Sequence, residues 1–130
     1  MSYKKKVTIC SSGSLVKKAK EWQKKLEEKN YQVIKVPVII KGNYAKMHSL
    51  HYKAIVESDI LFVLNLEKNG IINYIGPSVF AEIAFAIGLN LALKKQIKIF
   101  CLNLIPQNLP YSKELLLWKK LGWIKKWRKI

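Results

Sequence analysis

Residues 77–93 are apolar or small at almost every position, and Glu82 is the only ionisable residue among them. Gly76-Pro77-Ser78 opens this segment, and proline fits the first turn of a helix, whose free amides also favour anions. Because the segment is apolar on most faces, we expect a covered helix with a desolvated Glu82 about one turn inside it. Perturbed carboxylates cluster at functional sites, so Glu82 is the leading candidate; the alternative is a structural pair with a lysine at the helix rim.

The length of 130 residues allows one domain with one hydrophobic core, which we assign to residues 1–130. Residues 1–6 lead directly into a short strand, so we expect no secretory signal and a cytoplasmic protein. Cys10 and Cys101 each end an apolar run and are expected to be reduced, buried thiols. The carboxylate of Glu82 also disfavours a membrane span over residues 77–93.

The net charge of +16 raises the question of nucleic-acid binding, because lysine-rich surfaces bind phosphate backbones. Arg128 is the only arginine, whereas base recognition favours the guanidinium group. The lysines are also spread over solvent-face positions along the whole chain. A nucleic-acid-binding protein therefore stays as the weaker alternative to an enzyme that acts on a small molecule.

Alternating strand and helix patterns predict the fold. Residues 60–64 form a continuous apolar run, which is typical of a strand buried on both faces of a parallel sheet. Further strands are expected at residues 4–10, 31–36 and 97–101, with the second at an edge because Pro37 ends it. The basic tail after Gly122 is either a fifth strand or a packed arm. We therefore expect an α/β fold: a doubly wound, flavodoxin- or Rossmann-like parallel sheet of four to five strands in three α/β/α layers.

Ligands of such folds bind at the carboxyl ends of the strands. After the first strand comes a small-residue loop, in which Ser14 is expected to cap the following helix. Such a loop can hold an anion, although a tight turn uses the same residue types, and the glycine-lysine pattern of a P-loop is missing. The substrate-binding residues predicted at this edge are Ser11, Ser12, Gly13, Ser14, Asn65, Tyr74, Gly76 and Ser78.

Two histidines fall within the helix expected at residues 47–57. His48 and His51 are three positions apart and share a helix face. A metal site needs a third ligand, and no further histidine or cysteine cluster accompanies them, so we expect polar groups at a cleft and neither a metal nor a cofactor.

The serine-glycine loop, the strand after Asp59 and the segment from Tyr74 to Glu82 together resemble the nucleoside 2-deoxyribosyltransferase-like family, which includes 2′-deoxynucleoside 5′-phosphate N-hydrolases. The resemblance covers roughly residues 5–103. It implies cleavage or transfer of the N-glycosidic bond of a nucleoside or its 5′-monophosphate, with Glu82 as the nucleophile that attacks the anomeric carbon. It also implies that Ser11, Ser12 and Gly13 face the sugar or the phosphate.

Three positions depart from the family pattern. Phe80 and Ala84 stand where the family has glycines. The position that corresponds to the second carboxylate of the family falls near His51, and this chain has no clear carboxylate match there. A histidine there is a candidate general acid to the leaving base, and Tyr74 is a candidate hydrogen-bond partner of Glu82. The alternative is a non-catalytic nucleotide-binding module with the same fold. The apolar helix and the tryptophans further suggest a homodimer or a higher oligomer.

Overall fold

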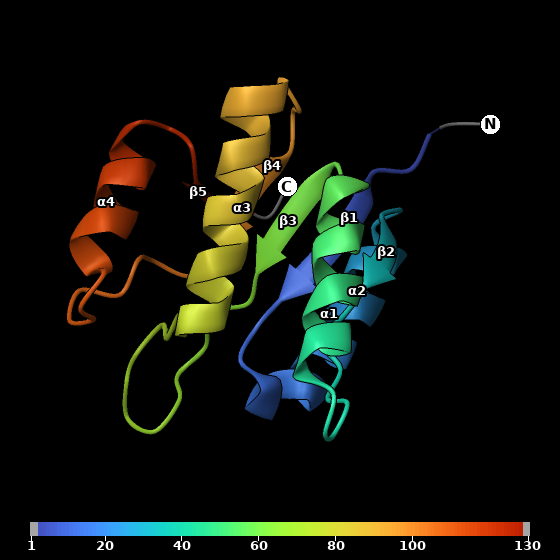
Figure 1. Ribbon diagram of the computed structural model, residues 1–130, viewed down its shortest axis with the longest axis horizontal. Helices are drawn as coiled ribbons and strands as arrows, with labels where there is room; N and C mark the ends of the chain where they lie inside the picture. Colours follow the sequence, from blue (N-terminus) through green and yellow to red (C-terminus); the bar gives the residue numbers. More distant parts are fainter. Residues whose placement is uncertain (1–2, 129–130) are drawn as a thin grey trace.

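Five parallel strands form one sheet in the order β2-β1-β3-β4-β5 (Figure 1). The computed structural model describes residues 3–128. Along the chain the elements are β1 (Lys6–Cys10), the 3₁₀ helix η1 (Gly13–Leu15), α1 (Val16–Glu28), β2 (Gln32–Lys35), α2 (Tyr44–Val56), β3 (Ile60–Val63), α3 (Pro77–Leu93), β4 (Lys98–Cys101), α4 (Ser112–Lys120) and β5 (Lys125–Lys126). This alternation confirms the predicted doubly wound α/β fold.

Strand β3 lies at the centre of the sheet, and all of its residues are buried. Val63 at its end is paired with Cys10 of β1 on one side and with Cys101 of β4 on the other. The continuous apolar run therefore has the predicted cause, since both faces of the strand are covered by helices. Its parallel register also brings the loops that follow β1 and β3 to the same edge of the sheet.

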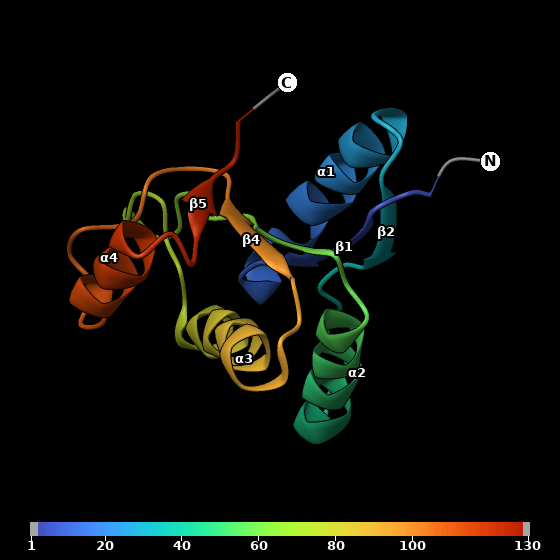
Figure 2. The same cartoon turned by 90° about the horizontal axis from the view of Figure 1, so that it is seen from above.

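Helices cover both faces of the sheet, which gives the three predicted layers (Figure 2). Helix α1 covers one face with Ala19 and Leu26, and Trp22 lies against Phe62 of β3 at a ring-centroid distance of 5.4 Å. Helices α2, α3 and α4 cover the opposite face. The larger of the two cores lies there and includes Ile55, Val79, Ile83, Ala86, Ile87, Leu115 and Trp118.

Helix α3 begins at Pro77 as predicted, and its buried residues are Val79, Glu82, Ile83, Ala86 and Ile87. The helix packs against the sheet and beside α2 and α4, so its apolar composition reflects coverage by other parts of the chain. Within residues 3–128 no helix has the length and apolar content needed to cross a membrane.

The helix starts differ in detail from the sequence predictions. Ser14 does not cap α1, because residues 13–15 first form η1 and Leu15 occupies the cap position. Helix α2 begins three residues before the predicted start, because the Asn43 side chain accepts a hydrogen bond from the Lys46 amide at 3.0 Å. A capping side chain therefore sets the start of α2, whereas α1 begins without a side-chain cap.

The basic tail contains the fifth strand. Lys125 and Lys126 of β5 pair in parallel with Phe100 and Cys101 of β4. Trp127 follows and lies edge-on against Phe62 and Phe100, at ring-centroid distances of 5.3 Å each. Of the two alternatives for the tail, the structure contains the strand, and Trp127 fixes it to the core on the α1 side of the sheet.

Asn65 joins the loops that follow β3 and β4. Its Oδ1 accepts a hydrogen bond from the Asn103 amide at 2.9 Å, and its Nδ2 donates to the carbonyl oxygens of Asn103 and Leu104 at 3.1 Å each. Asn103 returns a hydrogen bond from its Nδ2 to the Asn65 carbonyl at 3.0 Å. Both ends of the buried Asn65 amide are therefore used to hold the two loops together.

We predict that Asn65→Ala lowers the free energy of unfolding by about 2 kcal/mol or more, because it removes a buried side chain and the three hydrogen bonds that it makes to the backbone of residues 103 and 104. Denaturant unfolding of the two proteins measures this difference. The exposed Asn108 provides the control, and Asn108→Ala is expected to change the same quantity by less than about 0.5 kcal/mol. Equal effects of the two substitutions would contradict the structural role of Asn65.

Candidate functional site

A pocket of about 230 Å³ opens where the carboxyl ends of β1, β2 and β3 meet the first turns of α3. Strand β2 lies on one side of β1 and β3 lies on the other, so the strand order reverses at β1. Ligands of doubly wound folds bind at such a reversal of strand order. The pocket is lined by Ser11, Ser12, Gly13, Lys35, Pro37, Val38, Ile39, Met47, His48, His51, Lys68, Tyr74, Gly76, Pro77, Ser78, Val79 and Glu82.

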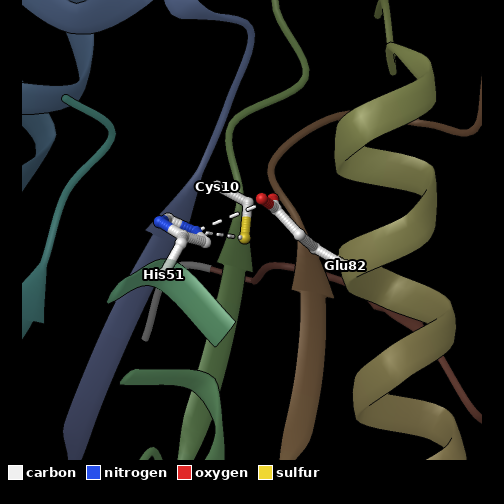
Figure 3. Close-up of side chains that lie close together, drawn as sticks. All are labelled: Cys10, His51 and Glu82. Atoms are coloured by element: carbon white, nitrogen blue, oxygen red, sulfur yellow. Dashed lines mark hydrogen bonds and ion pairs between the residues drawn. The ribbon is translucent and has the colours of Figure 1, made fainter. Parts of the chain in front are cut away.

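Three side chains from three different elements meet at the base of this region (Figure 3). Cys10 ends β1, His51 lies in the middle of α2, and Glu82 lies in the second turn of α3. The distance from Cys10 Sγ to His51 Nε2 is 3.2 Å, and that from His51 Nε2 to Glu82 Oε1 is 3.6 Å. All three residues are buried, and we call them the Cys-His-Glu cluster.

Burial changes the charge state of the two acid-base groups in this cluster. Desolvation raises the pKa of Glu82 from 4.5 to about 7, and a hydrogen bond with the Cys10 side chain partly opposes the rise. Desolvation lowers the pKa of His51 to about 4, and the positive field of Lys35 acts in the same direction. His51 is therefore neutral at pH 7, while the protonated and ionised forms of Glu82 are both well populated.

The Cys10 thiol is held in its protonated form. Its complete burial raises its pKa well above the ordinary value, and the negative charge of Glu82 raises it further. A thiol of this kind is a weak nucleophile, since the thiolate is the reactive form. In the absence of a cation, Cys10 therefore acts as a neutral neighbour of His51 and Glu82.

Anion-binding groups gather at the other side of the pocket. Lys68 Nζ donates a hydrogen bond to Ser12 Oγ at 2.5 Å, and it lies 5.5 Å from the centre of the Tyr74 ring. Gly76 is the N-cap residue of α3 and has no side chain to cap it, so the first amides of the helix are not satisfied by a capping side chain. A lysine, a serine hydroxyl and a helix N-terminus together suit an anionic group such as a phosphate.

Eight of the ten residues predicted for the site line the pocket: Ser11, Ser12, Gly13, His51, Tyr74, Gly76, Ser78 and Glu82. Ser14 and Asn65 are not among the lining residues. Ser14 is exposed in η1, and the Asn65 side chain is fully engaged in holding two loops. The position of a residue after a strand indicates the correct edge of the sheet. It does not tell whether the side chain faces the pocket or forms hydrogen bonds with the backbone of a neighbouring loop.

Tyr74 does not form the expected hydrogen bond with Glu82 within the described part of the chain. Its ring instead lies over Gly76, where an added Cβ would be 3.2 Å from a ring carbon and 3.3 Å from the hydroxyl oxygen. A side chain larger than hydrogen at position 76 would therefore displace the ring. Glycine at position 76 therefore suits the close approach of Tyr74, whose ring would have to move by a few tenths of an ångström to admit a Cβ.

Phe80 departs from the family pattern without narrowing the pocket. Its ring stacks on Trp118 of α4 at 5.1 Å and lies 4.6 Å from the ring of Tyr111. Tyr111 in turn donates a hydrogen bond to the Ile75 carbonyl at 2.6 Å, next to the start of α3. The large side chain at position 80 therefore serves the packing of α3 against α4, on the side away from Glu82.

Two neighbours of the site were missed from the sequence. Cys10 was interpreted only as a buried thiol, and Lys68 is one lysine among many in a basic chain. Cys10 lies 41 positions from His51, and Lys68 lies 56 positions from Ser12. The one available signal was the position of Cys10 at the end of a strand, directly before the small-residue loop.

No protein-family model matches this chain, and no curated protein matches it at a significant level. The likeness to the deoxyribosyltransferase-like family therefore depends on the residues quoted above.

We predict that Glu82→Gln stabilises the protein increasingly as the pH rises. Between pH 4.5 and about 7 the folded state keeps a proton on Glu82 that the unfolded state releases, so the native carboxyl costs stability as the pH increases. Relative to the wild type, the free energy of unfolding of Glu82→Gln should be nearly unchanged at about pH 4 and higher by about 3 kcal/mol at about pH 8. Denaturant unfolding at a series of pH values measures this difference.

Glu57→Gln, at an exposed position after α2, provides the matched control for this experiment. Solvent screens an exposed carboxylate, so this substitution is expected to shift stability by less than about 0.5 kcal/mol across the same range. If Glu82→Gln lost stability at high pH, Glu82 would instead be an ionised partner that stabilises the fold.

Proposed function

We propose that this protein cleaves or transfers the N-glycosidic bond of a nucleoside 5′-monophosphate or nucleoside, with Glu82 as the nucleophile. The observation that carries the proposal is the position of Glu82: a buried carboxylate that lines a pocket whose other side gathers Lys68, Ser12 and the start of α3. A substrate with an anion at one end and a reactive sugar carbon further along fits this arrangement. The residues quoted for the family resemblance add support.

The chemistry follows from one carboxylate and one water molecule. In the first step a Glu82 oxygen forms a bond to the anomeric carbon, and the bond from that carbon to the base nitrogen breaks, with its electron pair leaving on the base. In the second step water cleaves the sugar ester, which restores the carboxylate and places its hydroxyl on the sugar, while a proton reaches the base. In a transfer reaction a second base replaces the water.

The pKa of Glu82 suits this role. With a value of about 7, a large fraction of the carboxyl is ionised at neutral pH, and the poorly solvated anion requires little loss of water before it attacks. His51 fits the general-acid role less well, because a pKa of about 4 leaves its ring neutral at that pH. We assign His51 to positioning the Glu82 carboxylate, which it approaches to 3.6 Å.

The anion-binding side of the pocket supports a phosphorylated substrate. Lys35 and Lys68 both line the pocket, and the Lys68 ammonium donates a hydrogen bond to Ser12. In a chain of net charge +16 the surrounding field also favours an anionic ligand. The monophosphate is therefore the preferred substrate form in this proposal.

Glu82→Gln is predicted to lower the rate of base release by at least about 10³-fold, because an amide cannot replace the carboxylate as a nucleophile. Incubation with a panel of deoxynucleosides and their monophosphates, followed by chromatography of the free base, measures this rate. Glu57→Gln serves as the control and should retain wild-type turnover. Glu82→Gln should still bind the substrate, because glutamine has nearly the same volume as glutamate and also carries a polar group at the end of its side chain.

Two results would contradict the enzymatic proposal. If the wild-type protein binds monophosphates but releases no base from any of them, the chain is a nucleotide-binding module. If Glu82→Gln still releases base at the wild-type rate, Glu82 is not the nucleophile. Binding to nucleic acid that weakens steeply with salt would instead favour the lysine surface as the functional feature.

We further predict that monophosphates bind more tightly than the matching nucleosides, and that Lys68→Met removes about tenfold of this preference, as expected for one hydrogen bond to a charged group. Calorimetric titration of the two ligand forms measures it. Lys20→Met on the exposed side of α1 removes the same charge and should leave the preference unchanged. A preference that survives Lys68→Met would exclude Lys68 from phosphate binding.

The expected oligomer and location belong to the same proposal. The described residues include exposed leucines on α3 and α4, namely Leu91, Leu93 and Leu117, and these support self-association. Three tryptophans, however, are packed within the chain: Trp22, Trp118 and Trp127. The free thiols of Cys10 and Cys101 agree with a cytoplasmic location.

A further inference from the structure

We propose that Cys10, His51 and Glu82 form a binding site for a divalent cation of the zinc class. Three potential ligand atoms, the Cys10 sulfur, a ring nitrogen of His51 and a carboxylate oxygen of Glu82, all lie within 4.8 Å of one another. The three side chains point toward one another from β1, α2 and α3 (Figure 3). The sequence predicted no metal, because His48 and His51 lacked a third ligand. The fold instead places two other potential ligands, Cys10 and Glu82, beside His51.

The distances fit a tetrahedral centre. With Zn–N and Zn–O distances near 2.0 Å and Zn–S near 2.3 Å, neighbouring ligand atoms of a tetrahedron are about 3.3 to 3.6 Å apart. The distance from Cys10 Sγ to His51 Nε2 is 3.2 Å, and that from His51 Nε2 to Glu82 Oε1 is 3.6 Å. These two separations lie within a few tenths of an ångström of the required values. The third pair, Cys10 Sγ and a Glu82 carboxylate oxygen, lies within 4.8 Å, so enclosing a cation requires these two atoms to move closer together.

The combination of donors selects the kind of cation. A thiolate is a soft ligand, which Mg²⁺ and Ca²⁺ avoid because they prefer oxygen. One sulfur, one imidazole nitrogen and one carboxylate oxygen are all accepted ligands of Zn²⁺, and Co²⁺ takes the same tetrahedral sites. His51 is neutral at pH 7, which is the form of imidazole that binds metals.

The charge of the loaded centre also favours binding. Two anionic ligands, the Cys10 thiolate and the Glu82 carboxylate, balance a divalent cation, and His51 adds no charge. A neutral centre is the arrangement that buried surroundings tolerate best. Without a cation the Cys10 thiol holds its proton, and the cation replaces that proton on binding.

The site has an open side. Cys10 is completely buried, whereas His51 and Glu82 line the pocket. A cation held by the three ligands therefore has its fourth position directed at the pocket, as in zinc sites that bind water or a substrate. Such a cation would take a carboxylate oxygen of Glu82, the group that the proposed glycosidic reaction uses as its nucleophile, so we expect the bound cation to slow base release. The binding proposal itself does not depend on that reaction.

Titration of the purified chain with Co²⁺ tests the proposal. We expect one equivalent to bind with a cobalt–thiolate charge-transfer absorption in the near ultraviolet, and Zn²⁺ to displace it. Cys10→Ser should abolish the absorption. His51→Ala and Glu82→Gln should each weaken binding by at least about tenfold, the smaller of the losses seen when a supporting residue of a metal site is removed.

Cys101→Ser is the matched control, because Cys101 is also a buried free thiol but lies on β4, separated from β1 by β3. It should retain both the absorption and the affinity. The proposal is overturned if the folded wild-type chain takes up no stoichiometric Co²⁺, if Cys10→Ser retains the absorption, or if Cys101→Ser loses it. Circular dichroism verifies that each variant is folded. If Cys10→Ser does not fold, the isosteric Glu82→Gln decides the outcome by its affinity for Co²⁺.

Discussion

The parallel pairing of β3 with β1 and β4 is the constraint on which the site depends. Parallel strands end at the same edge of a sheet, so the loops that follow β1 and β3 lie side by side although they are distant in sequence. The register places Cys10 opposite Val63, and the residues that follow Cys10 line the pocket. A shift of register by one residue would turn Cys10 to the other face, away from α2 and α3.

The same arrangement explains why the Cys-His-Glu cluster carries perturbed protonation states. Helices α2 and α3 lie on one face of the sheet, and each buries one titratable side chain against the end of β1. No lysine reaches Glu82 as an ion-pair partner within residues 3–128, so desolvation outweighs other effects on its pKa. The fold thus holds a carboxyl group in an unfavourable environment, which is the usual cost of a pre-organised functional site.

The pocket has the desolvated Glu82 carboxyl at one part and polar groups at another, and different elements of the fold supply these two parts. The uncapped start of α3 and the loop after β1 provide backbone groups, and Lys68 arrives from the long loop before α3. Gly76 permits the close approach of Tyr74, which lines the pocket. The proposed substrate, which has one anionic group and one less polar part, matches this gradient of polarity.

Local patterns in the sequence determined the fold class, the buried helix of residues 77–93 and the isolation of Glu82. Hydrophobic periodicity and helix-start signals depend on residues within a few positions of one another, so they can be recognised without tertiary information. The same patterns placed Ser14 at a helix cap, which was wrong, and Asn65 at the ligand, whereas the Asn65 side chain holds two loops together. Which loop groups bind a ligand and which satisfy neighbouring backbone depends on contacts with other loops, such as that between Asn65 and Asn103.

Only the tertiary structure decided which groups surround Glu82. Cys10 meets His51 across 41 positions of sequence and Lys68 meets Ser12 across 56, and neither contact follows from a local pattern. Strand register, crossover direction and the way α2 and α3 pack side by side fix these contacts together. The sequence alone therefore identified the buried carboxylate. The thiol and imidazole beside it, with the pKa values that burial gives them, are consequences of how distant segments pack.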